Sequence, residues 1–162
     1  IIEAWKEADL ILTTGGVSVG EKDLLPGVIE NLNGNVLFHG IQVKPGMPTM
    51  LSVVEDIPVL SLSGNPFAVA ALFELLVGGY LADRAEEVYI QKKETKVLRQ
   101  TFVKTGKPKR IVKGKCDEEG VFLPQIQRNG QLKNGIGSNC LVVFPEGERT
   151  YPEGEKVQVI RI

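Results

Sequence analysis

Apolar and polar positions follow two different patterns along the chain, and the pattern changes near residue 85. The first part has continuous apolar runs, typical of buried strands, separated by segments with helical spacing. The expected strands cover 9–14, 36–43, 49–54 and 57–63, and the expected helices cover 23–32 and 67–82. We expect Gly78 and Gly79 to interrupt the second helix. Strands alternating with helices predict an α/β domain with a parallel sheet over residues 1–84.

The second part is a succession of short runs in which apolar and polar residues alternate. These runs cover 88–98, 100–105, 110–115, 121–127, 139–145 and 155–162. Turn signals rich in glycine, asparagine or aspartate separate them about every ten residues. This spacing predicts a small antiparallel all-β barrel over residues 88–162, without a helix, after a linker at about 83–87.

The composition is that of a globular protein that does not span a membrane. Of the 162 residues, 43% are hydrophobic and 24% are charged, and no apolar run approaches the roughly 20 residues that cross a bilayer. The opening IIEAWKEADL lacks the features of a signal peptide, so we expect a cytoplasmic protein whose chain starts inside a domain. Cys116 and Cys140 have no zinc-type spacing, and two buried thiols are favoured over a disulfide.

Charge is distributed unevenly along the chain. Residues 92–115 carry 10 basic and 1 acidic side chains, although the formal net charge of the whole chain is −1. A basic run of this kind can bind nucleic acid. Its lysines alternate with apolar residues, as on the solvated face of an antiparallel strand, and Phe102 is its single aromatic residue for base stacking. We therefore interpret the run as a strand face and do not expect nucleic acid as a partner.

The loop TTGGVSVGEKD follows the apolar run 9–14 and carries residues suited to bind an anion. Gly15 and Gly16 leave backbone amides uncovered near the start of a helix, and Ser18 adds a hydroxyl. A tight turn that needs glycine for its geometry alone explains the same residues equally well. Asp23 can cap the following helix, which its position favours, or hold Mg²⁺ beside a phosphate.

Two further loops add to this candidate site. Lys44 comes before a proline and a glycine that fix its backbone, and its compact positive charge suits phosphate or another tetrahedral anion. A surface lysine beside a proline turn is the simpler alternative. Asn65 and Pro66 have the positions of a helix cap and a first helical residue. If the strands before the two turns are parallel, both turns open on one edge of the sheet and share a negatively charged ligand.

The segments TTGGVSVGEKD, KPGMPT and SGNPFAVAALF, in this order, resemble the MoeA/gephyrin-E family of molybdopterin molybdenumtransferases. The second half of the chain, which ends in NCLVVFPEGERTYPEGEKVQVIRI, resembles the C-terminal β-barrel domain of the same family, so the resemblance covers essentially the whole chain. It implies that residues 1–84 are part of a MogA-like molybdopterin- and nucleotide-binding domain. It also implies an enzyme of molybdenum cofactor biosynthesis, which inserts molybdate into adenylylated molybdopterin and releases AMP, with Mg²⁺ as its cofactor.

The resemblance assigns roles to particular residues. Asp23 and Lys44 are implied to be catalytic, Asp23 as a ligand of Mg²⁺ and Lys44 as a residue that faces the anionic substrate. The residues implied to line the cofactor pocket are Gly15, Gly16, Ser18, Gly20, Pro45, Gly46, Ser63, Gly64, Asn65 and Pro66. The chain departs from the family where Ser63 replaces a usual proline. It departs again in a barrel motif, where asparagines stand in place of serines at 129 and 134.

The same resemblance implies partners and leaves alternatives open. A molybdopterin adenylyltransferase would act upstream, and the intact protein would be a homodimer. The family's first α/β strand with its GDE-type motif, and two further domains, are not found in the chain, so we expect a C-terminal portion that is inactive alone. A peptide-binding scaffold, as in the gephyrin branch, and a related MogA- or CinA-type nucleotide-binding protein are the alternative functions.

Overall fold

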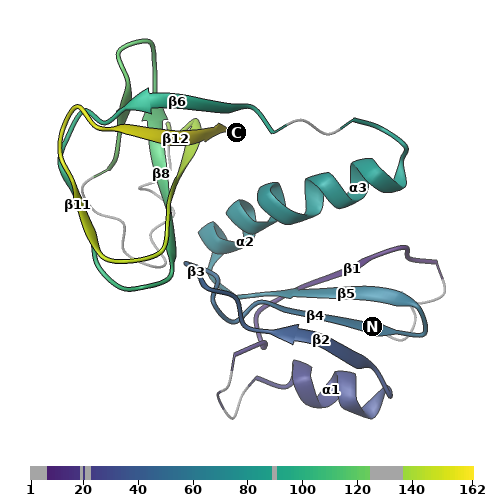
Figure 1. Cartoon of the computed structure of the whole chain (residues 1–162). Coiled ribbons are helices and arrows are strands. Elements are labelled where there is room, and N and C mark those ends of the chain that lie inside the picture. Colours follow the sequence, from purple (N-terminus) through teal and green to yellow (C-terminus); the bar gives the residue numbers. More distant parts are fainter. Residues whose placement is uncertain (1–6, 19, 21–22, 89–90, 125–136) are drawn as a thin grey trace. The chain divides into compact units, whose positions relative to one another are not determined.

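The computed structural model describes residues 7–18, 20, 23–88, 91–124 and 137–162. The chain divides into two compact units, the first formed by Ile1–Gln42 with Gly46–Val69 and the second by Val43–Pro45 with Ala70–Ile162. The first unit combines a sheet with helical segments, and the second is dominated by antiparallel strands (Figure 1). The predicted order, an α/β part followed by an antiparallel part, is confirmed.

The sheet of the first unit has the strand order β1-β5-β4-β2. Its strands are β1 (Ile11–Thr14), β2 (Asn35–His39), β4 (Met50–Val54) and β5 (Ile57–Leu62). β1 and β5 are parallel, whereas β4 is antiparallel to both β5 and β2, so the sheet is mixed rather than all parallel. Glu55 and Asp56 join β4 to β5 as a two-residue turn, and both have positive φ, at 48° and 68°.

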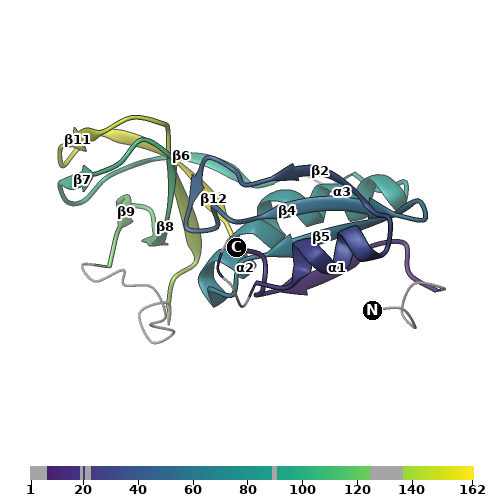
Figure 2. The same ribbon diagram turned by 90° about the horizontal axis from the view of Figure 1, so that it is seen from below.

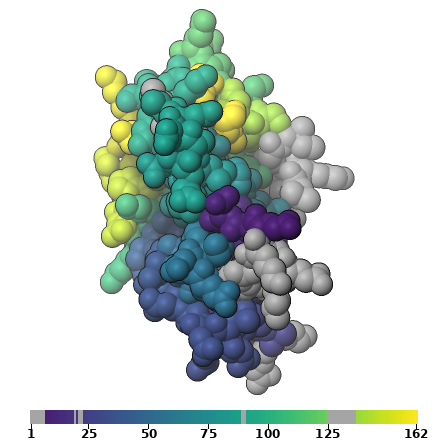
Figure 3. All heavy atoms as spheres, turned by 90° about the vertical axis from the view of Figure 1, so that its right-hand side faces the viewer, coloured from purple at the N-terminus to yellow at the C-terminus, as the bar shows by residue number. Residues whose placement is uncertain are grey.

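The core of the first unit lies between the sheet and the helix α1 (Leu25–Asn31) (Figure 1). Ile29 of α1 packs with strand residues such as Met50 and Val59, and all three side chains are fully buried. β1 is an edge strand, and its segment lies at the surface (purple in Figure 3). This explains why Leu12 is 39% exposed although the apolar run predicted a strand buried on both faces.

The predicted strand over 36–43 is wrong as a single element, because the chain turns at Gly40. Gly40 has a φ of 101°, and its amide donates a hydrogen bond to the carbonyl of Thr49. β2 therefore ends at His39, and the short strand β3 (Val43–Lys44) pairs in parallel with β8 of the second unit.

One continuous helical segment covers Pro66–Arg84, and it is irregular before its glycines rather than at them. It consists of α2 (Pro66–Leu72), a π-helical turn η2 (Phe73–Val77) and α3 (Gly78–Arg84). Gly78 has helical φ and ψ of −54° and −45°, so the predicted interruption at Gly78 and Gly79 is wrong. By length and composition this 19-residue segment, with a mean hydropathy of 1.4, could cross a membrane. The sequence predicted no segment long and apolar enough to do so. Core helices of soluble proteins share these properties.

Most of the second unit is built from antiparallel strands (Figures 1 and 2). They are β6 (Lys93–Val97), β7 (Phe102–Lys104), β8 (Lys109–Cys116), β9 (Val121–Phe122), β10 (Cys140–Phe144), β11 (Arg149–Tyr151) and β12 (Lys156–Arg161). The main sheet has the order β3-β8-β10-β12-β6, with β9 beside β8, and β11 pairs with β7. This order forms an open path and not a closed barrel among the described residues. β11 is a strand that the sequence pattern missed.

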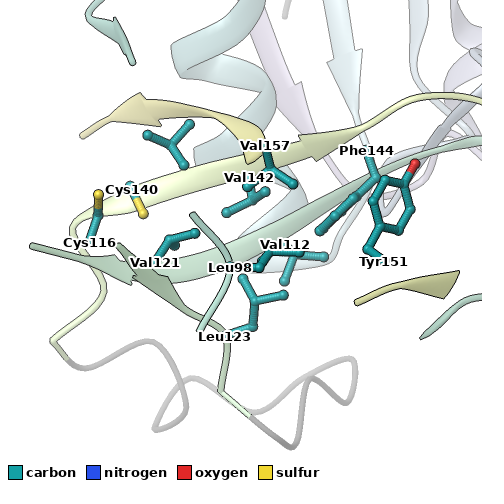
Figure 4. Close-up of a cluster of buried hydrophobic side chains, with 11 residues drawn as sticks. Leu98, Val112, Cys116, Val121, Leu123, Cys140, Val142, Phe144, Tyr151 and Val157 are labelled. Atoms are coloured by element: carbon teal, nitrogen blue, oxygen red, sulfur yellow. The ribbon is translucent and has the colours of Figure 1, made fainter. Parts of the chain in front are cut away.

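The core of the second unit is lined by aromatic and aliphatic side chains (Figure 4). The ring of Phe144 stacks on Phe102 with centroids 4.4 Å apart and lies 4.7 Å from Tyr151. Phe102 is thus engaged within the protein, which removes the base-stacking residue that a nucleic-acid interface would use. Cys116 and Cys140 are buried free thiols, as predicted. Burial raises the pKa of Cys140 to about 12.

Candidate functional site

The two turns predicted to form one rim lie in backbone contact. Thr14 of β1 and Leu62 of β5 are partners in the parallel ladder, so the chain leaves both strands at the same edge of the sheet. The amide of Gly15 donates a hydrogen bond of 2.9 Å to the carbonyl of Leu62. A Cβ added at Gly64 would lie 3.5 Å from the Cα of Gly15. The expectation that the turns share one edge is confirmed.

The sequence predicted that the backbone amides of both Gly15 and Gly16 are available to bind an anion, and the structure differs for Gly15. Gly15 and Gly16 have φ values of 81° and 66°, a conformation that side chains disfavour. The Gly15 amide already bonds Leu62, so it is not free to bind a ligand. Within the described part of the chain, the amides of Gly16 and Gly64 donate no backbone hydrogen bond. These two amides are among the donors that the rim offers.

Asp23 closes the glycine loop instead of capping the helix. Its Oδ2 accepts a hydrogen bond of 3.0 Å from the amide of Gly20, and its own amide donates to the Gly20 carbonyl. The N-cap position of α1 is Leu24, which makes no side-chain cap, so the predicted capping role of Asp23 is wrong. The loop is also held by His39, whose Nε2 lies 2.7 Å from the carbonyl of Val17. A half-buried carboxylate is thereby fixed at the far end of the loop.

A divalent cation would find one fixed carboxylate in this loop. No group of three or more His, Cys, Asp or Glu side chains with metal-binding geometry occurs among the residues that the structure describes. Mg²⁺ usually takes only one or two protein carboxylates and completes its shell with phosphate oxygens and water. Asp23 therefore fits a Mg²⁺ ion that arrives with a phosphorylated ligand, and does not fit a cation held by protein ligands alone.

The second turn begins a well-capped helix. Oδ1 of Asn65 accepts hydrogen bonds from the amides of Phe67, at 3.0 Å, and Ala68, at 3.2 Å. The predicted Asn65 cap with Pro66 as the first helical residue is confirmed. The preceding Ser63 is buried, and its hydroxyl has no hydrogen-bond partner in the described structure. Ser18 and Gly20 of the first loop are exposed.

Lys44 lies in the second unit, next to a basic residue that the sequence did not single out. The parallel pairing of β3 with β8 makes Lys44 the partner of Arg110, so the two cationic side chains emerge on one face of the sheet. Burial lowers the pKa of Arg110, which is the effect expected when a cation loses water without gaining a counterion. Neither side chain makes an ion pair among the described residues. The pair is suited to bind an anion.

The turn after Lys44 is tightly held. The Lys44–Pro45 peptide bond is cis, and Gly46 has a φ of 115°. The Gly46 carbonyl accepts hydrogen bonds from the hydroxyl of Thr49, at 2.7 Å, and from its amide, at 3.2 Å. The barrel motif noted in the sequence, from Gln127 to Asn134, lies outside the described residues.

Known proteins with similar sequences share one function in their names. Residues 1–83 match the family described as a probable molybdopterin binding domain. The chain is 33% identical over 165 residues to the molybdopterin molybdenumtransferase of Bacillus subtilis, covering 99% of this chain and 38% of the relative. It is 31% identical to the enzyme of the same name from Staphylococcus aureus, and spans 39% of that protein. The chain thus spans less than half the length of these relatives.

Solved structures give the same result. A MoeA protein of molybdopterin biosynthesis from Pyrococcus horikoshii superposes with a TM-score of 0.82 at 27% identity, over 99% of this chain and 39% of that one. A molybdenum cofactor biosynthesis protein from Pyrococcus furiosus superposes with a TM-score of 0.74 at 28% identity, and this chain covers 52% of it. The resemblance to MoeA-type molybdenumtransferases is confirmed, and the chain belongs to the family of probable molybdopterin binding domains.

Proposed function

We propose that the protein to which this chain belongs inserts molybdate into adenylylated molybdopterin and releases AMP. The names of the relatives support this reaction. The structural observation that carries it is the contact between the glycine turn and the start of the Asn65 helix. This contact gives one rim on which the Gly16 and Gly64 amides donate no backbone hydrogen bond to any described residue. Both molybdate and the phosphates of the nucleotide are oxyanions, which such donors bind.

The residues divide between the two units by the kind of donor that they supply. In the first unit, the rim offers neutral backbone amides, and Asp23 offers a carboxylate beside them. In the second unit, Lys44 and Arg110 offer two positive charges without a counterion among the described residues. We assign the phosphate of the nucleotide to the amides, because they form directed hydrogen bonds. We assign molybdate to the cationic pair, because a dianion gains most from positive charge.

Magnesium, the oligomeric state and the cellular context belong to the same proposal. Mg²⁺ bound through Asp23 would neutralise charge on the phosphate oxygens of the bound nucleotide. Gly46 and Pro66 would shape the wall of the nucleotide site in the first unit, and Pro45 follows Lys44 in the second unit. We further propose a cytoplasmic homodimer that receives adenylylated molybdopterin from an adenylyltransferase.

Calorimetric titration of the 162-residue chain with AMP and with sodium molybdate tests the proposed sites. Lys44→Ala should weaken molybdate binding about tenfold, the effect of losing one charged hydrogen bond, and should leave AMP binding within twofold. Lys109→Ala is the matched control, because Lys109 is the partner of Val43 and projects from the other face of β8. Asp23→Ala should weaken AMP binding only when Mg²⁺ is present.

The titrations have clear contrary outcomes. Equal losses with Lys44→Ala and Lys109→Ala would show that general positive charge, rather than the pair, attracts molybdate. If wild-type chain bound neither compound, the proposed sites would be wrong for this chain. We expect the chain alone to lack insertion activity, and full activity in a molybdate-insertion assay would overturn that expectation.

A further inference from the structure

Three buried hydroxyl groups precede the two turns of the rim without any partner. Thr13 lies two residues before Gly15, and Ser61 and Ser63 come just before Gly64. Ser61 is fully buried and Ser63 is 8% exposed. The hydroxyl oxygens of all three residues make no hydrogen bond in the described structure. Buried polar groups are nearly always paired in folded proteins, so a cluster of unpaired ones requires an explanation.

Strand pairing places two of these hydroxyls side by side. Thr13 and Ser61 are partners in the parallel ladder of β1 and β5, and side chains at paired positions emerge on the same face of a sheet. On β4, the partner of Ser61 is Met50, which packs with Ile29 of α1. The hydroxyls therefore lie on the face that α1 covers, at the end of the strands that leads into the rim.

A further hydroxyl on the face of Thr13 and Ser61 shows that a buried hydroxyl of this sheet can find a hydrogen-bond partner. Ser52 of β4 is fully buried, and its hydroxyl donates to the carbonyl of Val59 at 3.5 Å. Ser52 and Val59 are ladder partners two positions further from the rim than Met50 and Ser61. The sheet thus satisfies a hydroxyl away from the rim and leaves those next to the rim available.

The available groups can all donate hydrogen bonds. Each of the three hydroxyls lies within three residues along the chain of Gly16 or Gly64, whose amides donate no backbone bond in the described part of the chain. The buried side chains around them, such as Ile11 and Val59, are apolar and offer no acceptor. The two amides can only donate and the three hydroxyls can turn their O–H toward a ligand, so the set can bind a tetrahedral oxyanion, whose exposed atoms are all acceptors.

We propose that Thr13, Ser61 and Ser63 form a second layer of donors at the rim and bind oxygen atoms of the bound oxyanion. Their hydroxyls are unpaired without ligand and paired when it is present. Because this extends the proposed function, it adds ligand-contacting residues to that site. It assigns a part in ligand specificity to the hydroxyls of Ser61 and Thr13, which had no individual role in the sequence analysis.

Three single substitutions test this layer in the 162-residue chain. Ser61→Ala removes only the hydroxyl, Thr13→Val keeps the shape of the side chain, and Ser52→Ala is the control on the same face. Inorganic phosphate and sodium molybdate are the probes, with affinity measured by calorimetry and melting temperature measured without ligand. We expect Ser61→Ala and Thr13→Val to weaken binding of one probe about tenfold, with unchanged or higher melting temperature.

The two readouts separate a ligand contact from a structural role. Removing an unpaired buried hydroxyl should not destabilise the free protein, whereas Ser52→Ala should lower the melting temperature and leave affinity within twofold. Unchanged affinity in both Ser61→Ala and Thr13→Val would overturn the second layer, and the proposed function would stand if Lys44→Ala still weakens molybdate binding. Absence of any binding to the wild-type chain would overturn both. A lower melting temperature with unchanged affinity would show that the hydroxyls hold structural water instead.

Discussion

Replacing Asn65 separates the stability of the second turn from its role in binding. Asn65→Ala removes the oxygen that accepts hydrogen bonds from the Phe67 and Ala68 amides, at 3.0 and 3.2 Å. Loss of an asparagine cap typically costs about 1 kcal/mol, within a range of about 0.5–2 kcal/mol. For a chain of this length that corresponds to a fall of about 2–4 °C in melting temperature. Urea unfolding followed by circular dichroism at the helical band measures the change in free energy of unfolding.

Asn65→Asp is the informative partner of this variant. Aspartate caps helices as well as asparagine does, so the free energy of unfolding should stay within about 0.5 kcal/mol of wild type. The new negative charge at the rim should repel an oxyanion, and phosphate binding measured by calorimetry should fall at least tenfold. Wild-type stability in Asn65→Ala would refute the capping argument. Undiminished phosphate binding in Asn65→Asp would refute the position of the ligand at this rim.

Three further predictions follow from the second unit. Gly120→Ala should destabilise by about 2–4 kcal/mol in urea unfolding, because φ is 144° there and a Cβ would overlap the Val97 carbonyl oxygen; near-wild-type stability would contradict the geometry. Burial raises the pKa of Cys140 to about 12. The protonated thiol therefore contributes fully to the stability of the folded state below the ordinary thiol pKa, and this contribution is lost as the pH rises from there toward about 12. Iodoacetamide at about pH 8 should therefore leave Cys140 unmodified in native protein and label it after unfolding, as mass spectrometry can show. The hydrogen bond from Arg161 lowers the pKa of Glu94, so the folded state loses stability when Glu94 is protonated. Between about pH 5 and pH 3 the wild type should therefore lose more stability than Glu94→Gln. Equal losses would show that the Glu94–Arg161 pair does not cause the acid sensitivity.

Features specified by neighbouring residues were predicted well from the sequence. The Asn65-Pro66 helix start is one, because its hydrogen bonds span two and three residues. The turn at Glu55 and Asp56 is another, because these two polar residues are all that separates the expected strands 49–54 and 57–63. The shared edge of the two turns followed from a single assumption, that the strands before them are parallel.

Features that depend on distant partners were missed. The break at Gly40 is stabilised by a hydrogen bond to the Thr49 carbonyl, and a single glycine inside an apolar run is only a weak sign of a turn. Arg110 becomes a neighbour of Lys44 through the pairing of β3 with β8, which joins segments far apart in the sequence. Asp23 stands one residue too early to cap α1, and a shift of this size lies within the error of any helix boundary predicted from sequence.

The rim exists only when β1 and β5 have paired, because Gly15 and Gly64 come from distant parts of the chain. An unfolded chain therefore has no partial version of it, and a ligand that binds there binds the native state alone. By mass action such a ligand shifts the folding equilibrium: at a concentration 100 times its dissociation constant it adds about 2.7 kcal/mol. The concentration of such a ligand would then influence how much of this protein survives proteolysis.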